Sequence, residues 1–279
     1  MNGNIPWPSM GVLHLQEGSS KFRLTRHAPS EEVAFFVKHY WIVRWELSEG
    51  ETYSQEVLPN PCMNLVVERG KTAVYAPSKQ KFSYPLEGRG CVFGVKFKPG
   101  GFYPFSRLPA AQLGGRPLEA GPLFGVNPRE LEEDILSQEE ESRMVELAEG
   151  LLRPKLPPQD EQVPFLGGIV ERIRTDRGMT RVDYVAEAFG ISVRTLQRLF
   201  HQYVGVSPKW VIQLYRLHNA AEAMEMSRHP DGLELSMELG YHDQAHFIKD
   251  FKAIVGRTPE QYAKGKLDPE KAGNMSSLT

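Results

Sequence analysis

The sequence predicts an α+β protein in which a β-rich N-terminal domain precedes an all-α C-terminal domain. With 279 residues, of which 41% are hydrophobic, the chain is long enough to bury two modest cores. Residues 1–118 are rich in proline, glycine, β-branched and aromatic residues, a composition typical of short strands separated by turns. From Phe165 onward, apolar residues recur at helical spacing, and a nine-residue pattern occurs twice.

Several short strands are predicted in residues 1–118. The segments 40–47, 63–67 and 90–97 are rich in β-branched and aromatic residues, and polarity alternates along parts of them. Strands of this length, separated by turn residues, predict a small barrel or sandwich. In this part of the chain only the segment at about 31–39 has the apolar spacing of a helix.

The N-terminal part lacks the patterns of a metal-dependent or nucleophilic enzyme. The sequence contains no His-x-His pair, and His14, His27 and His39 lie outside the predicted strands. Neither a Gly-x-Ser-x-Gly elbow nor a phosphate-binding loop occurs. Cys62 and Cys91 form neither a CxxC motif nor a Cys/His cluster, so two buried thiols are expected. We therefore predict no catalytic residues, no metal and no cofactor.

A small-molecule site in the mouth of the barrel is the remaining functional interpretation of the N-terminal domain. Such sites are mostly apolar and contain a few polar groups that orient the ligand. For each candidate residue the alternative is a packed side chain of the core. The candidates are Trp41, Trp45, Tyr53, Cys62, Asn64, Phe93 and Phe97.

The middle of the chain is acidic and helical. Residues 119–161 contain twelve acidic and four basic residues, which hides the positive charge of the flanking parts in the net charge of −2. Apolar residues at helical spacing predict two antiparallel helices within 128–152, whose apolar faces either form a dimer contact or cover the barrel. Four prolines and a polar stretch at 159–162 mark an interdomain linker over 154–164.

The last third of the chain repeats a pattern of the form Phe-x3-Val-Gly-x-Ser/Thr-Pro. The two copies begin at Phe200 and, fifty-one residues later, at Phe251. A glycine precedes each copy, Gly190 in the first and Gly240 in the second, where it ends one helix and begins a tight turn into the next. Two helix-turn-helix units in one chain are typical of a protein that places two helices in DNA.

The first of these units presents a polar helix face suited to reading bases. Arginine can form two hydrogen bonds with guanine and glutamine two with adenine, so Arg194, Gln197 and Arg198 at i, i+3 and i+4 form a candidate reading face, with Thr195 beside them. Residues 190–216 contain four Lys or Arg residues and no Asp or Glu, so the electrostatic potential around the first unit is expected to be positive. The alternative is an ordinary solvated helix face, which the flanking turn motifs make the weaker interpretation.

The second unit follows a long helix. Pro208, after Ser207 as N-cap, begins a helix that is predicted to run to about residue 227 and to act as a rigid spacer. Lys209 and Arg216 on this helix are expected, if they reach DNA, to contact phosphate. Asp243 is predicted to cap the second recognition helix. Its outward-facing candidates are Gln244, Ala245, His246 and Lys249.

Residues 165–265 resemble the DNA-binding domain of the AraC/XylS family of bacterial transcription regulators. The resemblance rests on the segments 194–200 and 240–247 and on both Val-Gly-x-Ser/Thr-Pro turns. It implies seven helices, with the fourth joining two units that enter successive major grooves of double-stranded DNA. It also implies base contacts from Arg194, Gln197 and Arg198 in the first unit and from Gln244, Ala245 and Lys249 in the second. Ala245 departs from this pattern because it offers only a methyl contact, so the second helix is expected to read less sequence.

Segments 58–64 and 94–102 resemble the cupin-like N-terminal domain of one branch of the same family. The sequence thus predicts a DNA-binding transcription regulator, of the activator type, that responds to a small organic effector. RNA polymerase is a partner implied by the family, and a homodimer is expected from the acidic helices. The predicted parts are a cupin-like sensor domain at 1–118, a helical connector at 119–153, the linker at 154–164, the DNA-binding domain at 165–266 and a tail at 267–279.

Two alternatives remain. Some DNA-alkylation repair proteins carry the same helical module, but they hold zinc with four cysteines, and this sequence has two. The other alternative is a regulator with a degenerate sensor that acts through dimerisation or a protein partner. No apolar run approaches the roughly 18 residues that cross a bilayer, and the first residues lack the pattern of a secretory leader, so we expect a cytoplasmic protein without a membrane partner.

Overall fold

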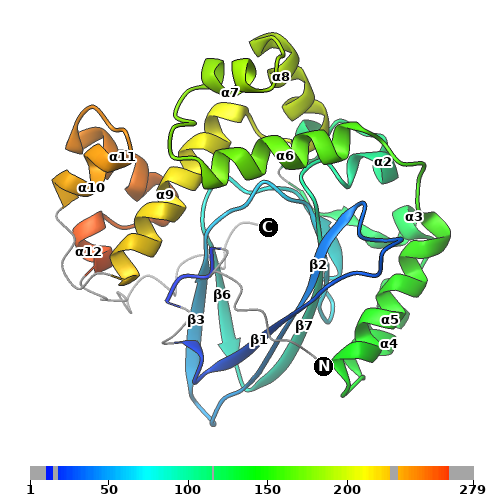
Figure 1. Ribbon diagram of the computed structural model, residues 1–279. Helices are drawn as coiled ribbons and strands as arrows, with labels where there is room; N and C mark the ends of the chain where they lie inside the picture. Colours follow the sequence, from blue (N-terminus) through cyan, green and yellow to red (C-terminus); the bar gives the residue numbers. More distant parts are fainter. Residues whose placement is uncertain (1–10, 15–17, 115, 227–231, 264–279) are drawn as a thin grey trace.

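A β-rich N-terminal half and a helical C-terminal half make up the structure, a computed structural model (Figure 1). It describes residues 11–14, 18–114, 116–226 and 232–263. The predicted α+β class is confirmed. None of the described helices is both long and apolar enough to cross a membrane.

The N-terminal strands form two antiparallel sheets. The larger has six strands in the order β1-β2-β7-β4-β5-β8, and β3 pairs with β6 in a separate two-stranded sheet. Among the described residues, β3 pairs with β6 and, through one isolated bridge, with Val12, and neither β3 nor β6 pairs with a strand of the large sheet. Hydrogen bonds between these strands therefore do not close the predicted barrel. The bounds are β1 Phe22–His27, β2 Val37–Glu46, β3 Thr52–Val57, β4 Asn64–Val67, β5 Ala73–Tyr75, β6 Phe82–Glu87, β7 Arg89–Phe97 and β8 Leu118–Glu119.

One face of the large sheet is covered by helices. Side chains alternate between faces along a strand, and the pairs Ile42↔Phe93 and Tyr40↔Val95 place four buried residues on this outer face. Three helices pack on it: α3 Ala120–Phe124, α4 Pro128–Leu136 and α5 Glu141–Leu152 (Figure 1). The apolar residues of α4 and α5 therefore cover the sheet, which is one of the two roles predicted for them. Their buried members are Leu131, Ile135, Met144, Ala148 and Leu152.

The opposite, inner face of the large sheet faces the β3–β6 pair. Trp41 and Trp45 lie on this face across from Gly94 and Gly90. A Cβ atom at either glycine would lie 2.0 Å from the facing indole ring, so only glycine allows the rings to lie flat on β7. The Trp45 and Tyr84 ring centroids are 5.9 Å apart, which brings β2 against β6. A small apolar cluster thus joins the two sheets.

The prediction of a helix at 31–39 is wrong. Residues 31–36 form turns, and β2 begins at Val37, which pairs with Phe97 of β7. Val33, Phe36 and Val37 are almost fully buried in the core of the large sheet. Strand pairing and burial therefore override the helical spacing of these apolar residues.

The described residues of the C-terminal half form the seven helices that the family resemblance implied. Helix α9 contributes apolar side chains to two separate cores, with Val211 and Ile212 in the first and Leu214 and Leu217 in the second. The predicted spacer is therefore also a structural part of both helix-turn-helix units (Figure 1). The bounds are α6 Gln162–Thr175, α7 Val182–Ala188, α8 Val193–Leu199, α9 Pro208–Met226, α10 Gly232–Glu238, α11 Gln244–Val255 and α12 Pro259–Ala263.

Candidate DNA-binding surface

The two predicted recognition helices, α8 and α11, begin in the same way. Gly190 and Gly240 have φ values of +63° and +72°, the left-handed conformation that a helix end before a tight turn requires. The Ser192 side chain accepts a hydrogen bond from the Thr195 backbone N–H at 3.1 Å. Asp243 does the same for the His246 N–H at 2.7 Å. Both predicted N-caps are confirmed, and the sequence repeat corresponds to a repeat of backbone geometry.

Helix α8 exposes the predicted reading residues of the first unit. Arg194, Gln197 and Arg198 are exposed, whereas Leu196 and Leu199 are buried in the first core. Thr195 is half-buried, and its hydroxyl lies 2.9 Å from the Ser192 Oγ atom. Thr195 therefore extends the helix cap, while the other three side chains extend into solvent.

Helix α11 presents a second polar face with less positive charge. The outward-facing candidates Gln244, Ala245, His246 and Lys249 are all exposed, and the inward-facing Phe247 is fully buried. The carboxylate of Asp250 lies 3.6 Å from His246 Nε2. A carboxylate beside the reading face weakens its attraction for phosphate. This arrangement agrees with the expectation that the second helix reads less sequence than the first.

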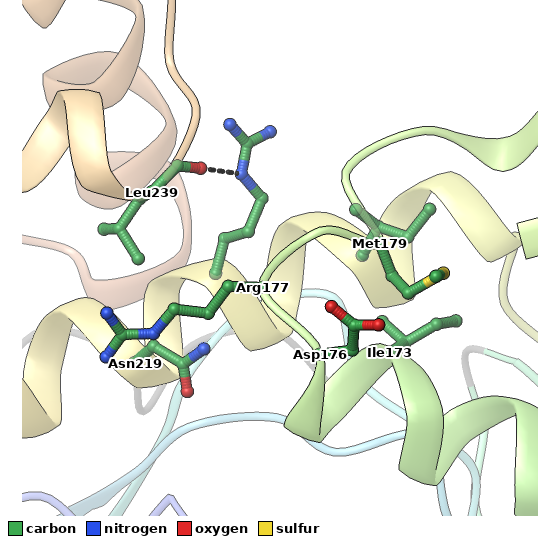
Figure 2. A pocket seen from close by; sticks show the side chains of 8 residues that line it. Ile173, Asp176, Arg177, Met179, Asn219 and Leu239 are labelled. Carbon is green, nitrogen blue, oxygen red and sulfur yellow. Dashed lines mark hydrogen bonds between the residues drawn. The ribbon is translucent and has the colours of Figure 1, made fainter. Parts of the chain in front are cut away.

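The two basic residues of α9 lie in different surroundings. Lys209 is exposed near the start of the helix. Arg216 is half-buried: its Nε atom donates a hydrogen bond to the Leu239 carbonyl at 2.7 Å, and its guanidinium carbon lies 4.1 Å from the centre of the Tyr241 ring. Figure 2 shows the bond to Leu239. Arg216 therefore connects α9 to the second unit, a role that the sequence did not indicate. The phosphate contact expected of Arg216, if it reaches DNA, stays a prediction.

A small cleft lies beside Arg216, where the C-terminal end of α6 and the C-terminal end of α10 approach α9. Ile173 and Asp176 at the end of α6 line it from one side, and Asn219 of α9 and Leu239 line it from the other (Figure 2). Its volume is about 10 Å³, which is the space of one water molecule. The two units also meet directly, since a guanidinium nitrogen of Arg177 lies 3.9 Å from a carboxylate oxygen of Glu238 on α10.

The first unit also contacts the N-terminal half. Gln202 follows α8 and donates a hydrogen bond to the Tyr103 hydroxyl at 2.6 Å; Tyr103 begins the short helix α2 Tyr103–Ser106. The Gln202 side chain in turn accepts a hydrogen bond of 3.5 Å from Arg198. Tyr103 also packs on Tyr203, with ring centroids 4.3 Å apart. Arg198 of the reading face is thus connected to Tyr103 of the N-terminal half through the side chain of Gln202.

The second unit is held by a buried ion-pair cluster. Glu56 of β3 forms ion pairs with both Lys81 and Arg257, and all three side chains are mostly buried. The Lys81 backbone N–H also donates to the Ile254 carbonyl of α11 at 3.2 Å. The N-terminal half therefore contacts both units, while the reading faces of α8 and α11 stay exposed.

Helix α9 contacts the loop that connects β3 and β4. His218 Nε2 lies 3.0 Å from the Pro59 carbonyl oxygen. Burial lowers the pKa of His218 to about 4, so the imidazole is neutral at neutral pH and donates this hydrogen bond. Leu13 and Leu58 of the N-terminal half belong to the apolar core of the second unit. The two halves thus share a hydrophobic contact with the part of α9 that belongs to the second unit.

The candidate effector residues do not lie together. Trp41 and Asn64 lie on the inner face of the large sheet, and the Trp41 Nε1 atom donates to the Asn64 Oδ1 atom at 3.4 Å. Trp45 and Tyr53 belong to the apolar cluster between the two sheets, and Cys62 is buried. Phe93 and Phe97 are fully buried under the helices on the outer face. Including these two in an inner pocket is wrong, because strand alternation places them with Val95 on the opposite face.

Two known domain families match parts of the chain. Residues 25–133 match a family described as a domain of unknown function (DUF6597). Residues 185–265 match a family described as a helix-turn-helix domain. The second match begins within α7 and includes α8, α9, α10, α11 and α12.

Curated proteins similar to this chain are regulators. An uncharacterized HTH-type transcriptional regulator of Haemophilus influenzae is 34% identical over 83 residues, which are 30% of this chain and 28% of that protein. The F1 operon positive regulatory protein of Yersinia pestis is 36% identical over 81 residues, 29% of this chain and 27% of that protein. The chain therefore matches less than a third of the length of these relatives.

Among solved structures, a transcriptional regulator of Chromobacterium violaceum, described as containing an AraC-type DNA-binding domain, is 23% identical to this chain. The alignment covers 38% of this chain and 95% of that chain, with a TM-score of 0.35.

Proposed function

We propose that this protein is a sequence-specific DNA-binding regulator of transcription with a C-terminal domain of the AraC type. Residues 185–265 match a helix-turn-helix domain family, and curated proteins similar to this part of the chain are regulators. The observation that carries the proposal is the pair of helices α8 and α11. Each begins at a glycine turn with a side-chain cap and exposes a polar face away from its core. Two such helices joined by the rigid helix α9 are equipped to enter two major grooves.

In this proposal the first unit provides most of the sequence readout. Arg194 and Arg198 pair with guanine and Gln197 pairs with adenine, because their exposed side chains project from one face of α8. Gln244, Ala245 and Lys249 of α11 make fewer directional contacts, and the Asp250 carboxylate lies 3.6 Å from His246 Nε2. Lys209 contacts a phosphate, which adds affinity without sequence preference.

Replacement of Arg194 by alanine tests the reading role. Fragments bound by the purified full-length protein are first selected from random DNA, and binding to the selected site is then measured. The Arg194→Ala variant is expected to lose about 1–3 kcal/mol of binding free energy on the selected site and to become less selective at one base position. Affinity for unrelated DNA should change much less, since that affinity comes from phosphate contacts.

Lys209→Ala is the matched control for Arg194→Ala, because Lys209 is exposed and carries the same charge outside the reading face. It should weaken binding to all sequences alike and reduce the salt dependence of binding. An equal loss on selected and unrelated DNA for Arg194→Ala would remove Arg194 from the reading face. Failure to select any preferred sequence would count against the proposed function itself.

The N-terminal half is proposed to be a sensor for a small organic effector. Two features support this role: the inner face of the large sheet carries the partly exposed side chains of Trp41 and Asn64, and the N-terminal half contacts both helix-turn-helix units. Ligand binding there would act through its different affinity for two arrangements of the halves. The alternative is a degenerate sensor that responds to a protein partner or only dimerises, and a ligand-independent N-terminal half would favour it.

The remaining features of the proposal follow from the regulatory role. The protein is placed in the cytoplasm and acts as an activator together with RNA polymerase. A homodimer stays a prediction, and its contact would lie outside the apolar faces of α4 and α5, because these faces cover the sheet. It is proposed to have no catalytic activity and to need no cofactor. The proposed division is a sensor domain at 1–118, a helical connector at 119–153, a linker at 154–164 and a DNA-binding domain at 165–266. Helix α6 begins at Gln162, so the end of the predicted linker is helical. The predicted tail at 267–279 lies outside the described residues.

A further inference from the structure

Three basic residues lie next to one another on the inner face of the large sheet. The register aligns His39 of β2 with Lys96 of β7, and Lys96 with Asn64 of β4. The neighbouring row on the same face contains Arg26 of β1 opposite Trp41 of β2. Rows two residues apart on one face of a sheet are within reach of long side chains. The sheet therefore gathers an arginine, a lysine and a histidine from three strands.

Lys96 is buried without a counter-charge. The residue is 8% exposed, and no carboxylate of the described residues acts on its ammonium group. Burial lowers the pKa of Lys96 to about 8, which leaves the group mostly protonated at neutral pH. A positive charge on a mostly buried residue without a neighbouring carboxylate is costly, so a site of this kind favours an anion that neutralises it.

The other charges around Lys96 do not neutralise it. His39 is 2% exposed, and burial lowers its pKa to about 2, with the positive charge of Lys96 acting in the same direction. The group that acts most strongly on Lys96 is the Cys62 thiol, and burial raises the pKa of this thiol, so it is uncharged at neutral pH. The other side chains that act on Lys96 and His39 are Lys38 and Arg26, which are positive. His39 is therefore a neutral imidazole in a positive environment, able to donate one hydrogen bond.

Apolar surface lies directly beside this cluster. Trp41, Val43 and Val66 are partly exposed on the same inner face. The Trp41 indole is fixed by its contact with Gly94 and by the hydrogen bond to Asn64. A positively charged group next to a fixed aromatic ring is suited to a molecule with an anionic end and an apolar body.

We propose that the inner face of the sheet binds the carboxylate or phosphate group of a small anionic molecule. Lys96 and Arg26 provide the positive charge, and Trp41 contacts the apolar part of the molecule. The proposal rests on the sensor function proposed above and specifies the chemical class of the effector. It also places the effector on the face opposite to Phe93 and Phe97.

The proposed site lies close to the helix that carries both DNA-binding units. The segment before β4 contains Cys62 and Pro59; the Asn64 side chain donates to the Cys62 carbonyl at 3.3 Å, and His218 of α9 contacts the Pro59 carbonyl at 3.0 Å. A continuous set of contacts thus runs from the site, through residues 59–64, to α9. An anion beside Lys96 and Asn64 therefore has a direct structural route to the DNA-binding half.

The test uses the full-length protein and two organic probes of the same shape, cyclohexanecarboxylate and cyclohexanecarboxamide, together with inorganic phosphate. The Tm is measured without DNA, at neutral pH and constant ionic strength. The carboxylate, phosphate or both should raise the Tm of the wild type by mass action, and the neutral amide should not. A response to the carboxylate indicates a carboxylate effector, and a response to phosphate indicates a phosphorylated one.

The decisive variant is Lys96→Met, with Lys79→Met at an exposed position as the control. Without probe, Lys96→Met should raise the Tm by a few degrees, because it replaces a mostly buried positive charge without a neighbouring carboxylate by an apolar side chain of similar length. It should also abolish the increase caused by the anion, whereas Lys79→Met should preserve that increase. A wild type that responds to neither anion, an equal response to the amide, or a Lys96→Met variant that keeps the full response would each overturn the proposal.

A DNA-binding measurement separates this inference from the proposed function. The affinity for a selected DNA site is measured by fluorescence anisotropy with and without the anion that raised the Tm. A change in DNA affinity that is lost in Lys96→Met and kept in Lys79→Met would show that the anion site is coupled to the DNA-binding half. An unchanged DNA affinity would show that the two are not coupled. If the protein binds no preferred DNA, the proposed regulator function is wrong. The change in Tm caused by the anion still tests the anion site, because it is measured without DNA.

Discussion

Replacement of Phe251 by alanine is expected to lower the free energy of unfolding by about 3–5 kcal/mol. The Phe251 side chain is fully buried in the core of the second helix-turn-helix unit. Its ring centroid lies 5.7 Å from that of Phe247 and 5.6 Å from that of Tyr262, so the substitution leaves a cavity between α11 and α12. Urea unfolding followed by circular dichroism measures the loss.

The neighbouring Lys252→Ala variant is the control for Phe251→Ala. Lys252 is exposed on the same helix, and its replacement should change the free energy of unfolding by less than about 0.5 kcal/mol. If Phe251→Ala costs no more than this control, the second unit is not packed around Phe251 as described. Because Phe251 holds α11 in place, the variant should also lose the contacts that α11 makes with DNA.

Glu56→Gln is expected to destabilise the protein by about 3 kcal/mol. The substitution keeps the shape of the side chain and removes the charge that pairs with Lys81 and Arg257. The exposed fractions of the side chains are 10% for Glu56, 21% for Lys81 and 13% for Arg257, so solvent replaces the lost charge poorly. Thermal unfolding of the full-length protein should therefore show a clear decrease in Tm.

An exposed ion pair provides the comparison for Glu56→Gln. Glu146 pairs with Arg143 on α5, with exposed fractions of 64% and 56%, and Glu146→Gln should cost at most about 1 kcal/mol. A Glu56→Gln variant as stable as Glu146→Gln would show that the contact between β3 and the second unit does not persist in solution. In that case the two halves would be connected through α2 and the first unit, through the contact of His218 with Pro59, and through Leu13 and Leu58.

Local features of the C-terminal half were predictable from the sequence. The left-handed glycines and the caps at Ser192 and Asp243 depend on interactions within three or four residues, which a sequence pattern records directly. The start of α9 at Pro208 follows from the same kind of rule. The outward face of α8 was predictable because the helical period fixes which residues share the buried side.

Contacts between distant segments were not predictable in the same way. Glu56 and Arg257 are 201 positions apart, and Tyr103 and Gln202 are 99 positions apart, so no local pattern relates them. The sequence allows a phosphate contact for Arg216, because it does not show that the Leu239 carbonyl of the second unit lies beside α9 and accepts a hydrogen bond from Arg216. These contacts depend on how the two halves dock.

The sheet shows a further limit of the sequence analysis. Alternation along β7 separates Phe93 and Phe97 from Lys96, but it does not show which face the helices cover. The candidate effector list therefore mixed residues from both faces. The basic cluster of Arg26, His39 and Lys96 was missed because it depends on the register of three strands.

A methylation-interference footprint on the selected DNA site tests the central claim most directly. The full-length protein is the right material, because Leu13 and Leu58 of the N-terminal half complete the core of the second unit. If α8 and α11 both enter DNA, modified guanines should interfere in two successive major grooves on one face of the duplex, with centres roughly 34 Å apart. Interference confined to a single groove, or in grooves on opposite faces, would contradict a protein that reads DNA with two helices held by α9.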